Sequence, residues 1–224
     1  MADLVLDFHA HVLPMLDHGS DSVETSLFQL SEAKRHGVEH ILATSHFYPS
    51  RHSVEGFVKS RADSYPLLAE RLDDSFPTIH LGAEVLLCDG LDTMPGLSEL
   101  FIEGTRVLLL ELPFADFSRS YADTVYTLVR DGVEVVLAHA ERYKEENIDL
   151  LIQNGAKLQI NAASLCGLVI PSRIKRWLAS GVVVGLGTDI HKRDATAYKR
   201  FAKARRRIGE RVLPIIEYAK KIIE

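Results

Sequence analysis

Histidines and carboxylates recur at the ends of the apolar runs of this 224-residue chain. The series begins with His9 and His11 after "LVLDF" and finishes with Asp189 and His191 after "VVVGLGT". In barrel enzymes the chemistry is built at the carboxyl ends of the strands. Imidazoles and carboxylates are also common ligands of transition metals. The pattern therefore predicts one shared centre for several metal ions.

The spacing within the series strengthens this prediction. His9 and His11 lie two residues apart, as do Asp189 and His191, so on an extended strand each pair leaves the same face and can bind one ion. A single HxH motif arises often by chance, whereas HxH, DxH and polar groups at the other strand ends form a much more specific signal. The complete series is His9, His11, His46, Glu84, Glu111, His139, Asn161, Asp189 and His191.

The elements that must position these groups alternate along the chain. Continuous apolar runs such as "RVLLLEL" predict strands covered on both faces, near residues 3–8, 38–44, 78–87, 106–111, 133–138, 157–161 and 182–187. Amphipathic stretches predict helices near residues 22–36, 55–73, 119–130, 146–154, 171–179 and 194–208. Glycines follow four of these helices, at Gly37, Gly132, Gly155 and Gly181.

Strands and helices in this order fit either an open doubly wound α/β sheet or a barrel. Edge strands of an open sheet would have little reason to carry ligands, whereas a closed barrel brings all carboxyl ends around one mouth. Because every predicted strand ends in a polar group, we favour the barrel. No linker or low-complexity block divides the sequence, so we expect a single domain over residues 1–224.

The composition narrows the class of protein. With 46% hydrophobic and 25% charged residues, the chain can bury a substantial core without disulfides. The two cysteines lack CxxC spacing, and we find neither a signal peptide nor a membrane-spanning stretch, so we expect a cytoplasmic protein without membrane insertion. A net charge of -5 argues against general affinity for nucleic acid. The oligomeric state stays open.

Seven segments in order carry a family resemblance: "DFHAHVLPMLDHGS", "ATSHF", "GAEVLL", "LLLELPF", "AHAERY", "LQINAASLCG" and "GLGTDIHK". Over residues 3 to about 192 they resemble the PHP (polymerase and histidinol phosphatase) superfamily. "AHAERY" is close to the histidine, proline, glutamate, arginine, tyrosine motif of its bacterial protein-tyrosine phosphatase branch, which is associated with capsule and exopolysaccharide synthesis. The resemblance implies a distorted, seven-stranded, TIM-like (β/α)7 barrel and three divalent ions, commonly manganese, iron, zinc or magnesium.

The resemblance also implies a ligand set for each ion. Carried over by motif, the sets are His9, His11 and Asp189 for the first ion, Glu111 and His139 for the second with Glu84 bridging to the first, and His18, His46 and His191 for the third. Mixed nitrogen and oxygen ligands suit manganese, iron or zinc better than magnesium, and manganese is our leading hypothesis by resemblance. Asp7 and Asp17 flank the ligands, and we assign Asp7 to accept the second proton of a ligand imidazole.

The implied chemistry is phosphoester hydrolysis by attack of a metal-bridged hydroxide on phosphorus. Arg142, which follows the His139 motif position, is well placed for bidentate recognition of phosphate. Asn161 could order the water or the phosphate, or merely satisfy backbone groups. The general acid for the leaving group stays unassigned.

The cysteines do not support a different phosphatase mechanism. Cysteine phosphatases need CxxxxxR, but the sixth residue after Cys88 is Met94 and the sixth after Cys166 is Ser172. No GxSxG or GxxxxGK[ST] motif is present either. We therefore expect both cysteines to be small buried apolar residues.

Three hypotheses of function stay open. The first, by resemblance, is a protein-tyrosine phosphatase whose partner is a phosphotyrosine protein, the tyrosine-rich tail of a bacterial tyrosine kinase. The second is a phosphoesterase of small molecules or nucleotides, such as a histidinol phosphatase. The third is a non-catalytic metal-binding regulatory module. Amidohydrolases also begin with HxH, but they usually carry a histidine on the late strand where this chain has Asn161.

Four further histidines fall outside the strand-end series: His36, His40, His52 and His80. We expect most of them at the surface or at helix ends. Arg51 and His52 are ambiguous, because they follow His46 closely and could line the mouth of the site.

Overall fold

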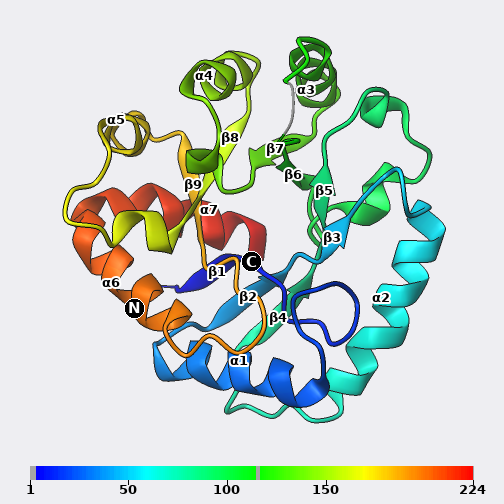
Figure 1. Ribbon diagram of the computed structural model, residues 1–224, viewed down its shortest axis with the longest axis vertical. Helices are drawn as coiled ribbons and strands as arrows, with labels where there is room; N and C mark the ends of the chain where they lie inside the picture. Colours follow the sequence, from blue (N-terminus) through cyan, green and yellow to red (C-terminus); the bar gives the residue numbers. More distant parts are fainter. Residues whose placement is uncertain (1–3, 115–116, 224) are drawn as a thin grey trace.

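Parallel strands form the centre of the molecule in a computed structural model that describes residues 4–114 and 117–223. The strands are β1 (Leu6–Ala10), β2 (His40–Ala43), β3 (His46–Phe47), β4 (Thr78–Leu81), β5 (Glu84–Leu86), β6 (Val107–Glu111), β7 (Glu134–Leu137), β8 (Lys157–Asn161) and β9 (Val183–Gly187). They pair in two sheets, ordered β1-β2-β4 and β3-β5-β6-β7-β8-β9 (Figure 1). The fold is therefore mixed α/β with parallel sheets.

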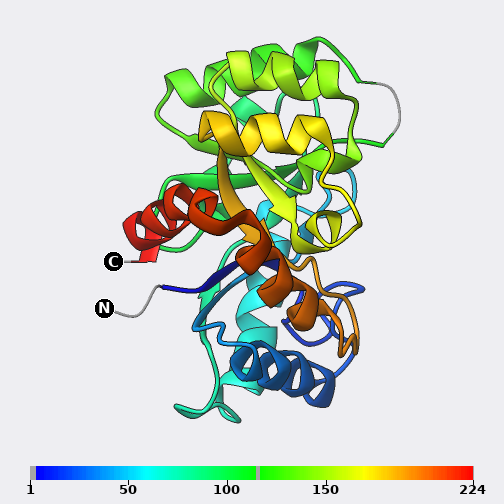
Figure 2. The same cartoon turned by 90° about the vertical axis from the view of Figure 1, so that its left-hand side faces the viewer.

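Helices surround these strands (Figures 1 and 2). They are α1 (Val23–Arg35), α2 (Val54–Ala69), α3 (Ser120–Arg130), α4 (Glu145–Gln153), α5 (Ser172–Ser180), α6 (Ala197–Ile208) and α7 (Leu213–Ile223), with short 3-10 helices η1 (Leu91–Thr93), η2 (Leu97–Leu100), η3 (Ala140–Arg142), η4 (Ala162–Leu165) and η5 (Gly209–Val212). Within the described ranges no helix has the length and apolar character needed to cross a bilayer.

The helix boundaries follow from local chemistry. Ser22 and Ser53 precede α1 and α2, and each hydroxyl accepts a hydrogen bond from a backbone N–H three residues on, which satisfies a donor that the helix leaves free. The four glycines predicted at helix ends all have a positive φ, between 75° and 94°. This left-handed conformation suits glycine and ends the helix, so these boundaries are confirmed.

One predicted strand is broken in the structure, and the short strand β3, which follows the strand predicted over residues 38–44, was not predicted. The prediction of one strand over residues 78–87 was wrong, because β4 pairs with β2 in one sheet while β5 pairs with β3 in the other. Between the two sheets, Gly82 N donates to Ala43 O and Glu84 N donates to Ser45 O. These hydrogen bonds keep the two chain segments adjacent across the interruption. Residue 3 of the first predicted strand lies outside the described residues, and β1 begins at Leu6.

Strand β1 lies beside β9, which brings the two ends of the ligand series together. Asp189 N donates to His9 O at 2.8 Å, and His11 N donates to Ile190 O at 3.3 Å. Side chains from both sheets also share one buried cluster, to which β1, β2, β6, β7 and β9 contribute. The HxH and DxH pairs are therefore neighbours in space although they lie at opposite ends of the series.

The sequence analysis missed the C-terminal helix. Helix α7 buries Tyr218, Ala219 and Ile222 in the cluster shared by the two sheets. Its polar anchor is Glu134 on β7, which accepts hydrogen bonds from Lys157 at 2.7 Å, from the Tyr218 hydroxyl at 3.1 Å and from Lys221. The helix therefore covers one end of the strands through both apolar and charged contacts.

We predict that Glu134→Gln destabilises the protein by about 1 kcal/mol, a value reduced for the partial exposure of the ion pairs. Burial opposes ionisation of Glu134, but the lysines outweigh it and lower its pKa from 4.5 to about 2. The stabilisation should be present above pH 4.5 and lost as the pH falls towards 2. Urea unfolding across this range measures it. Glu217→Gln, which removes an exposed carboxylate of α7, is the control, and equal effects of both variants would contradict the prediction.

Candidate functional site

The polar groups predicted at the strand ends converge in one cluster, although His46 and Glu84 begin the short strands β3 and β5 rather than end a strand. The contributing residues are His9 on β1, His46 on β3, Glu84 on β5, Glu111 at the end of β6, His139 after β7, Asn161 at the end of β8, and Asp189 after β9. His9, His11 and Glu84 are fully buried, and His139 is 1% exposed. Ionisable groups this deeply buried require compensating partners or a bound cation.

Glu84 lies at the centre of the cluster, where four imidazoles face its carboxylate. Its Oε2 atom is 3.2 Å from His9 Nε2 and 3.3 Å from His11 Nε2. His46 Nδ1 lies 2.9 Å from the same oxygen, and His139 Nε2 lies 2.8 Å from Oε1. Despite these short distances, neither Glu84 Oε2 nor His46 Nδ1 has a partner in hydrogen-bonding geometry. These two atoms converge without bonding each other, as ligands of a common ion would.

A glutamine fixes the orientation of the His9 ring. The backbone N–H of His139 can only donate, so the side-chain atom of Gln159 that lies 2.6 Å from it is the oxygen. The same oxygen is 3.1 Å from His9 Nδ1, which must therefore carry the ring proton. The lone pair of neutral His9 is then on Nε2 and faces Glu84, as metal ligation requires.

Two further imidazoles are oriented in the same way. His11 Nδ1 lies 2.7 Å from Asp17 Oδ2, and His191 Nδ1 lies 3.0 Å from the carbonyl oxygen of Asp189. Both acceptors hold the ring proton on Nδ1 and leave Nε2 free. The Nε2 atom of His191 is buried without a hydrogen-bond partner, which is costly unless a ligand binds there.

The distances at the first part of the cluster fit a transition metal. His9 Nε2 and His11 Nε2 are 3.1 Å apart, and Asp189 Oδ1 lies 3.7 Å and 3.4 Å from them. Two donors that each lie roughly 2.1 Å from one ion are separated by about 3.0 to 3.4 Å for angles near 90 to 109°. The two separations from His11 lie in this range, and that between His9 and Asp189 is slightly wider. Together with Glu84, these side chains have the chemistry and the close spacing of a metal site.

Three groups of candidate ligands overlap. They are His9, His11 and Glu84; His46, Glu84 and Glu111; and His11, His46 and His191, with the ligand atoms of each group within 4.8 Å of one another. His139 adjoins the second group, since its Nε2 is 3.6 Å from Glu111 Oε1. The exposed His18 ring stacks on His46 and His191, with centroids 4.7 Å and 4.6 Å apart. The structure thus brings all nine predicted ligands into one cluster.

A positive charge bound within the cluster would stabilise its carboxylates. Burial opposes ionisation of Asp189, but His9 and His11 outweigh it and hold its pKa well below the usual range. Burial likewise lowers the pKa of His11, yet Asp17, Asp189 and Glu84 together raise it well above 6.5. The pKa of Glu111 is raised to about 7 by burial and by the charge of Glu84. A divalent cation would relieve both the burial penalty and this repulsion.

The predicted catalytic residues Arg142 and Asn161 meet at one carboxylate. Arg142 Nη2 lies 2.5 Å from Asp189 Oδ2, and Asn161 Nδ2 donates to the same oxygen at 3.0 Å. Asp189 therefore turns one oxygen to the imidazoles and the other to these donors. The Asn161 side chain also accepts from Gln159 Nε2 at 2.9 Å, which links it to the residue that orients His9.

Asp7 has a different role from the one that we expected. Its carboxylate accepts from the backbone N–H and the hydroxyl of Thr188, at 2.9 Å and 2.6 Å, and from the backbone N–H of His9 at 3.3 Å. It supports the backbone of β1 and the turn after β9, while Gln159 and Asp17 hold the imidazoles. The reason is that Thr188 and the backbone N–H of His9 occupy both oxygens of the Asp7 carboxylate.

The remaining histidines take structural positions. His36 contacts Glu32 O at the end of α1, and His40 pairs with His80 at 3.0 Å between β2 and β4. His52 is exposed, and its Nδ1 accepts from the backbone N–H of Tyr48 at 3.2 Å.

The structure also shows the surroundings of Arg51 and of the two cysteines. The Arg51 guanidinium lies 5.4 Å from the centre of the Tyr48 ring, in the same turn as His52. Cys88 and Cys166 are unpaired. Both are partly buried and pack against the main hydrophobic cluster.

The backbone of the site is constrained at several points. His139 and Asp189 have positive φ angles of 34° and 53°, which non-glycine residues rarely adopt and which concentrate at functional sites. Gly187 leaves room for the site, since a Cβ there would lie 2.6 Å from Gln159 Nε2 and 2.7 Å from His9 Cβ. The sequence analysis missed Gln159 and Gly187. The signal for Gln159 was its place two residues before Asn161, on the same face of β8.

Comparison with known proteins identifies the family of the chain. The sequence profile of the capsular polysaccharide synthesis family CpsB/CapC matches residues 5–223. The chain belongs to this family. The resemblance found in the sequence is thereby confirmed.

The chain is similar to two tyrosine-protein phosphatases. It is 30% identical over 173 residues to tyrosine-protein phosphatase YwqE of Bacillus subtilis, covering 73% of this chain and 67% of the relative. It is 28% identical over 211 residues to tyrosine-protein phosphatase CpsB of Streptococcus pneumoniae, covering 85% and 84%.

Solved structures agree on the fold of this CpsB/CapC chain. A structure from the work on YwqE and CpsB, described as metal-dependent tyrosine phosphatases, matches with a TM-score of 0.78 at 22% identity, over 98% of this chain and 94% of the other. A TatD-like protein of Archaeoglobus fulgidus matches with a TM-score of 0.55 at 13% identity, over 97% and 98% of the two chains.

We predict that Gln159→Met weakens binding of divalent metal about 10- to 100-fold, because the acceptor that fixes the His9 ring is lost. Titration with Mn²⁺ followed by calorimetry measures the affinity, and circular dichroism checks the fold. Gln153→Met on α4, which lies outside the cluster, is the matched control. Unchanged affinity in a folded Gln159→Met protein would contradict this role.

Proposed function

We propose that this protein is a metal-dependent phosphoester hydrolase and, more specifically, a protein-tyrosine phosphatase. The observation that carries the proposal is the buried Glu84 carboxylate faced by four imidazoles, with the partly exposed Arg142 paired to the neighbouring Asp189. The names of the family relatives support the choice of substrate class.

The cluster offers ligands for three divalent ions, with manganese as the leading candidate and iron, zinc or magnesium as alternatives. We assign His9, His11 and Asp189 to the first ion and Glu111 and His139 to the second, with Glu84 between them; His18, His46 and His191 would hold the third. The overlapping groups support this, and His11 and His46 lie where they could serve neighbouring ions. Divalent ions held in this way supply a water of lowered pKa and clamp phosphate oxygens.

The side chains of this protein would then bind and orient the ester. The Arg142 side chain is 41% exposed, so its guanidinium can present its planar donors to a phosphate while Asp189 holds it from behind. Asn161 Nδ2 fixes the same Asp189 oxygen and keeps that carboxylate from rotating. Gln159 and Asp17 hold His9 and His11 with their Nε2 lone pairs directed into the site.

We also propose a distorted seven-stranded barrel that forms one domain. Counting β2 with β3 and β4 with β5 as single broken strands leaves seven positions, and the bonds between β1 and β9 support closure. The buried cluster shared by strands of both sheets is the interior that such a barrel needs. A cytoplasmic location is in keeping with the unpaired Cys88 and Cys166.

The partner that fits this proposal is a phosphotyrosine protein, and we infer the tyrosine-rich tail of a bacterial tyrosine kinase. A histidinol phosphatase or a nucleotide phosphoesterase could be built on the same ligands. The residues around the site, rather than the metal ligands, would decide between these substrates.

We predict that manganese-reconstituted protein hydrolyses a phosphotyrosine peptide faster than phosphoserine peptide or histidinol phosphate, and that a chelator abolishes the activity. Arg142→Ala should lower kcat/KM by about 10- to 100-fold through loss of a charged phosphate contact, with unchanged metal content. Arg142→Lys should recover only part of the loss. Arg176→Ala, which removes an exposed arginine of α5, is the control.

Steady-state kinetics across the three substrates and elemental analysis provide the readouts. Activity that survives complete removal of metal would refute the metal-dependent mechanism. Preference for histidinol phosphate would refute only the assignment of substrate.

A further inference from the structure

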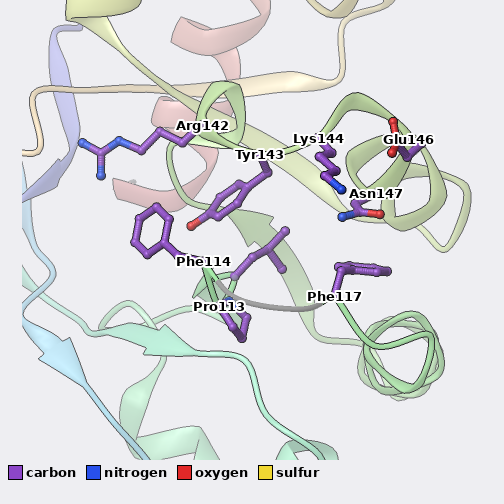
Figure 3. A pocket seen from close by; sticks show the side chains of 9 residues that line it. Pro113, Phe114, Phe117, Arg142, Tyr143, Lys144, Glu146 and Asn147 are labelled. Atoms are coloured by element: carbon purple, nitrogen blue, oxygen red, sulfur yellow. The ribbon is translucent and has the colours of Figure 1, made fainter.

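A cavity of about 500 Å³ opens beside the candidate metal centre (Figure 3). Its walls come from residues 112–114, which follow β6, and from residues 142–144, which lead from η3 to α4, together with Phe117 and the first turns of α4. Glu111 directly precedes the first wall segment, and His139 lies three residues before Arg142. The volume is within the range of about 300 to 1,000 Å³ that is usual for ligand pockets.

The end of the cavity next to the metal ligands is aromatic. Phe114 is 72% exposed, and its ring is nearly parallel to His139, at 13° with centroids 6.5 Å apart. Tyr143 lies 5.8 Å from Phe114, and its hydroxyl is 3.2 Å from His139 Nδ1 (Figure 3). Leaving a phenyl ring in water is unfavourable, and a bound apolar group would remove that cost.

The polar groups of the cavity are separated along its length. Arg142 reaches from the cavity towards Asp189, whereas Lys144 and Asn147 lie at the other end, beside Phe117 (Figure 3). A phosphate bound by Arg142 would therefore direct its ester group along Phe114 and Tyr143. An aryl group can stack on these rings, whereas the carbon of an alkyl phosphate offers them little area.

We propose that this cavity binds the aryl ring of phosphotyrosine, and that Phe114 determines specificity for aryl over alkyl phosphate esters. The inference rests on the proposed phosphatase function and names the residue that selects its substrate class. Phe114 acts through contact with the leaving group and holds no metal. Polar groups at the far end, Lys144 and Asn147, would face the peptide beyond the phosphotyrosine.

The test compares Phe114→Ala with Phe114→Tyr and with Tyr126→Ala, which removes a 55% exposed ring of α3 that does not line the cavity. Phe114→Ala should lower kcat/KM for phosphotyrosine peptide and p-nitrophenyl phosphate about fivefold, and leave phosphoserine peptide and metal content unchanged. Phe114→Tyr should retain the preference for aryl esters. Calorimetry should show the same loss for phenylphosphonate but none for methylphosphonate.

Equal losses on aryl and alkyl esters, or no loss on either, would overturn the role of Phe114 while the phosphatase function stands. A wild-type protein that hydrolyses none of these esters with metal bound would overturn the proposed function and this inference with it. The wild-type rates and the ratio of aryl to alkyl turnover therefore separate the two failures.

Discussion

The burial of the Glu84 carboxylate among imidazoles is the constraint on which the rest of the site depends. An ionised carboxylate removed from water costs several kcal/mol unless charges or ions of opposite sign compensate it. Here the four surrounding rings come from β1, β3 and the segment after β7, so the carboxylate is stabilised only when these elements are correctly assembled. A cation bound among them would couple the free energy of metal binding to the free energy of folding, because the ligands come together only in the folded protein.

A second layer of side chains orients the ligands of this centre. Gln159 and Asp17 hold the protons of His9 and His11 on the outer nitrogen, and Asn161 links Gln159 to Asp189. Gly187 permits the close approach of β9 to this network, since any larger side chain would meet Gln159 and His9. The ligands therefore do not need to reorient on binding, which reduces the entropic cost of forming the site.

Much of this arrangement could be predicted from the sequence, because strand ends are local features. Histidines and carboxylates after apolar runs identified the cluster of candidate ligands, and the glycines after four helices identified their ends. The break between β4 and β5 and the short strand β3 were not predicted, because the β2–β4 and β3–β5 pairs keep the same register across the interruption. Gln159 and Asp17, rather than Asp7, accept the second proton of a ligand imidazole. Which side chain reaches each ring becomes visible only when the strands are assembled. Helix α7 was not predicted, because its apolar face is explained only by the buried cluster that it covers in the folded protein.

The most direct test of the account is the metal content of Glu84→Gln beside that of the wild-type protein, measured by elemental analysis after reconstitution with Mn²⁺ and removal of free ions. The substitution keeps the size of the side chain but removes the charge that the imidazoles surround. The account predicts that the wild-type protein retains more than one ion per chain and that folded Glu84→Gln retains fewer, with little phosphotyrosine turnover. Equal metal content and equal turnover in the two proteins would contradict it.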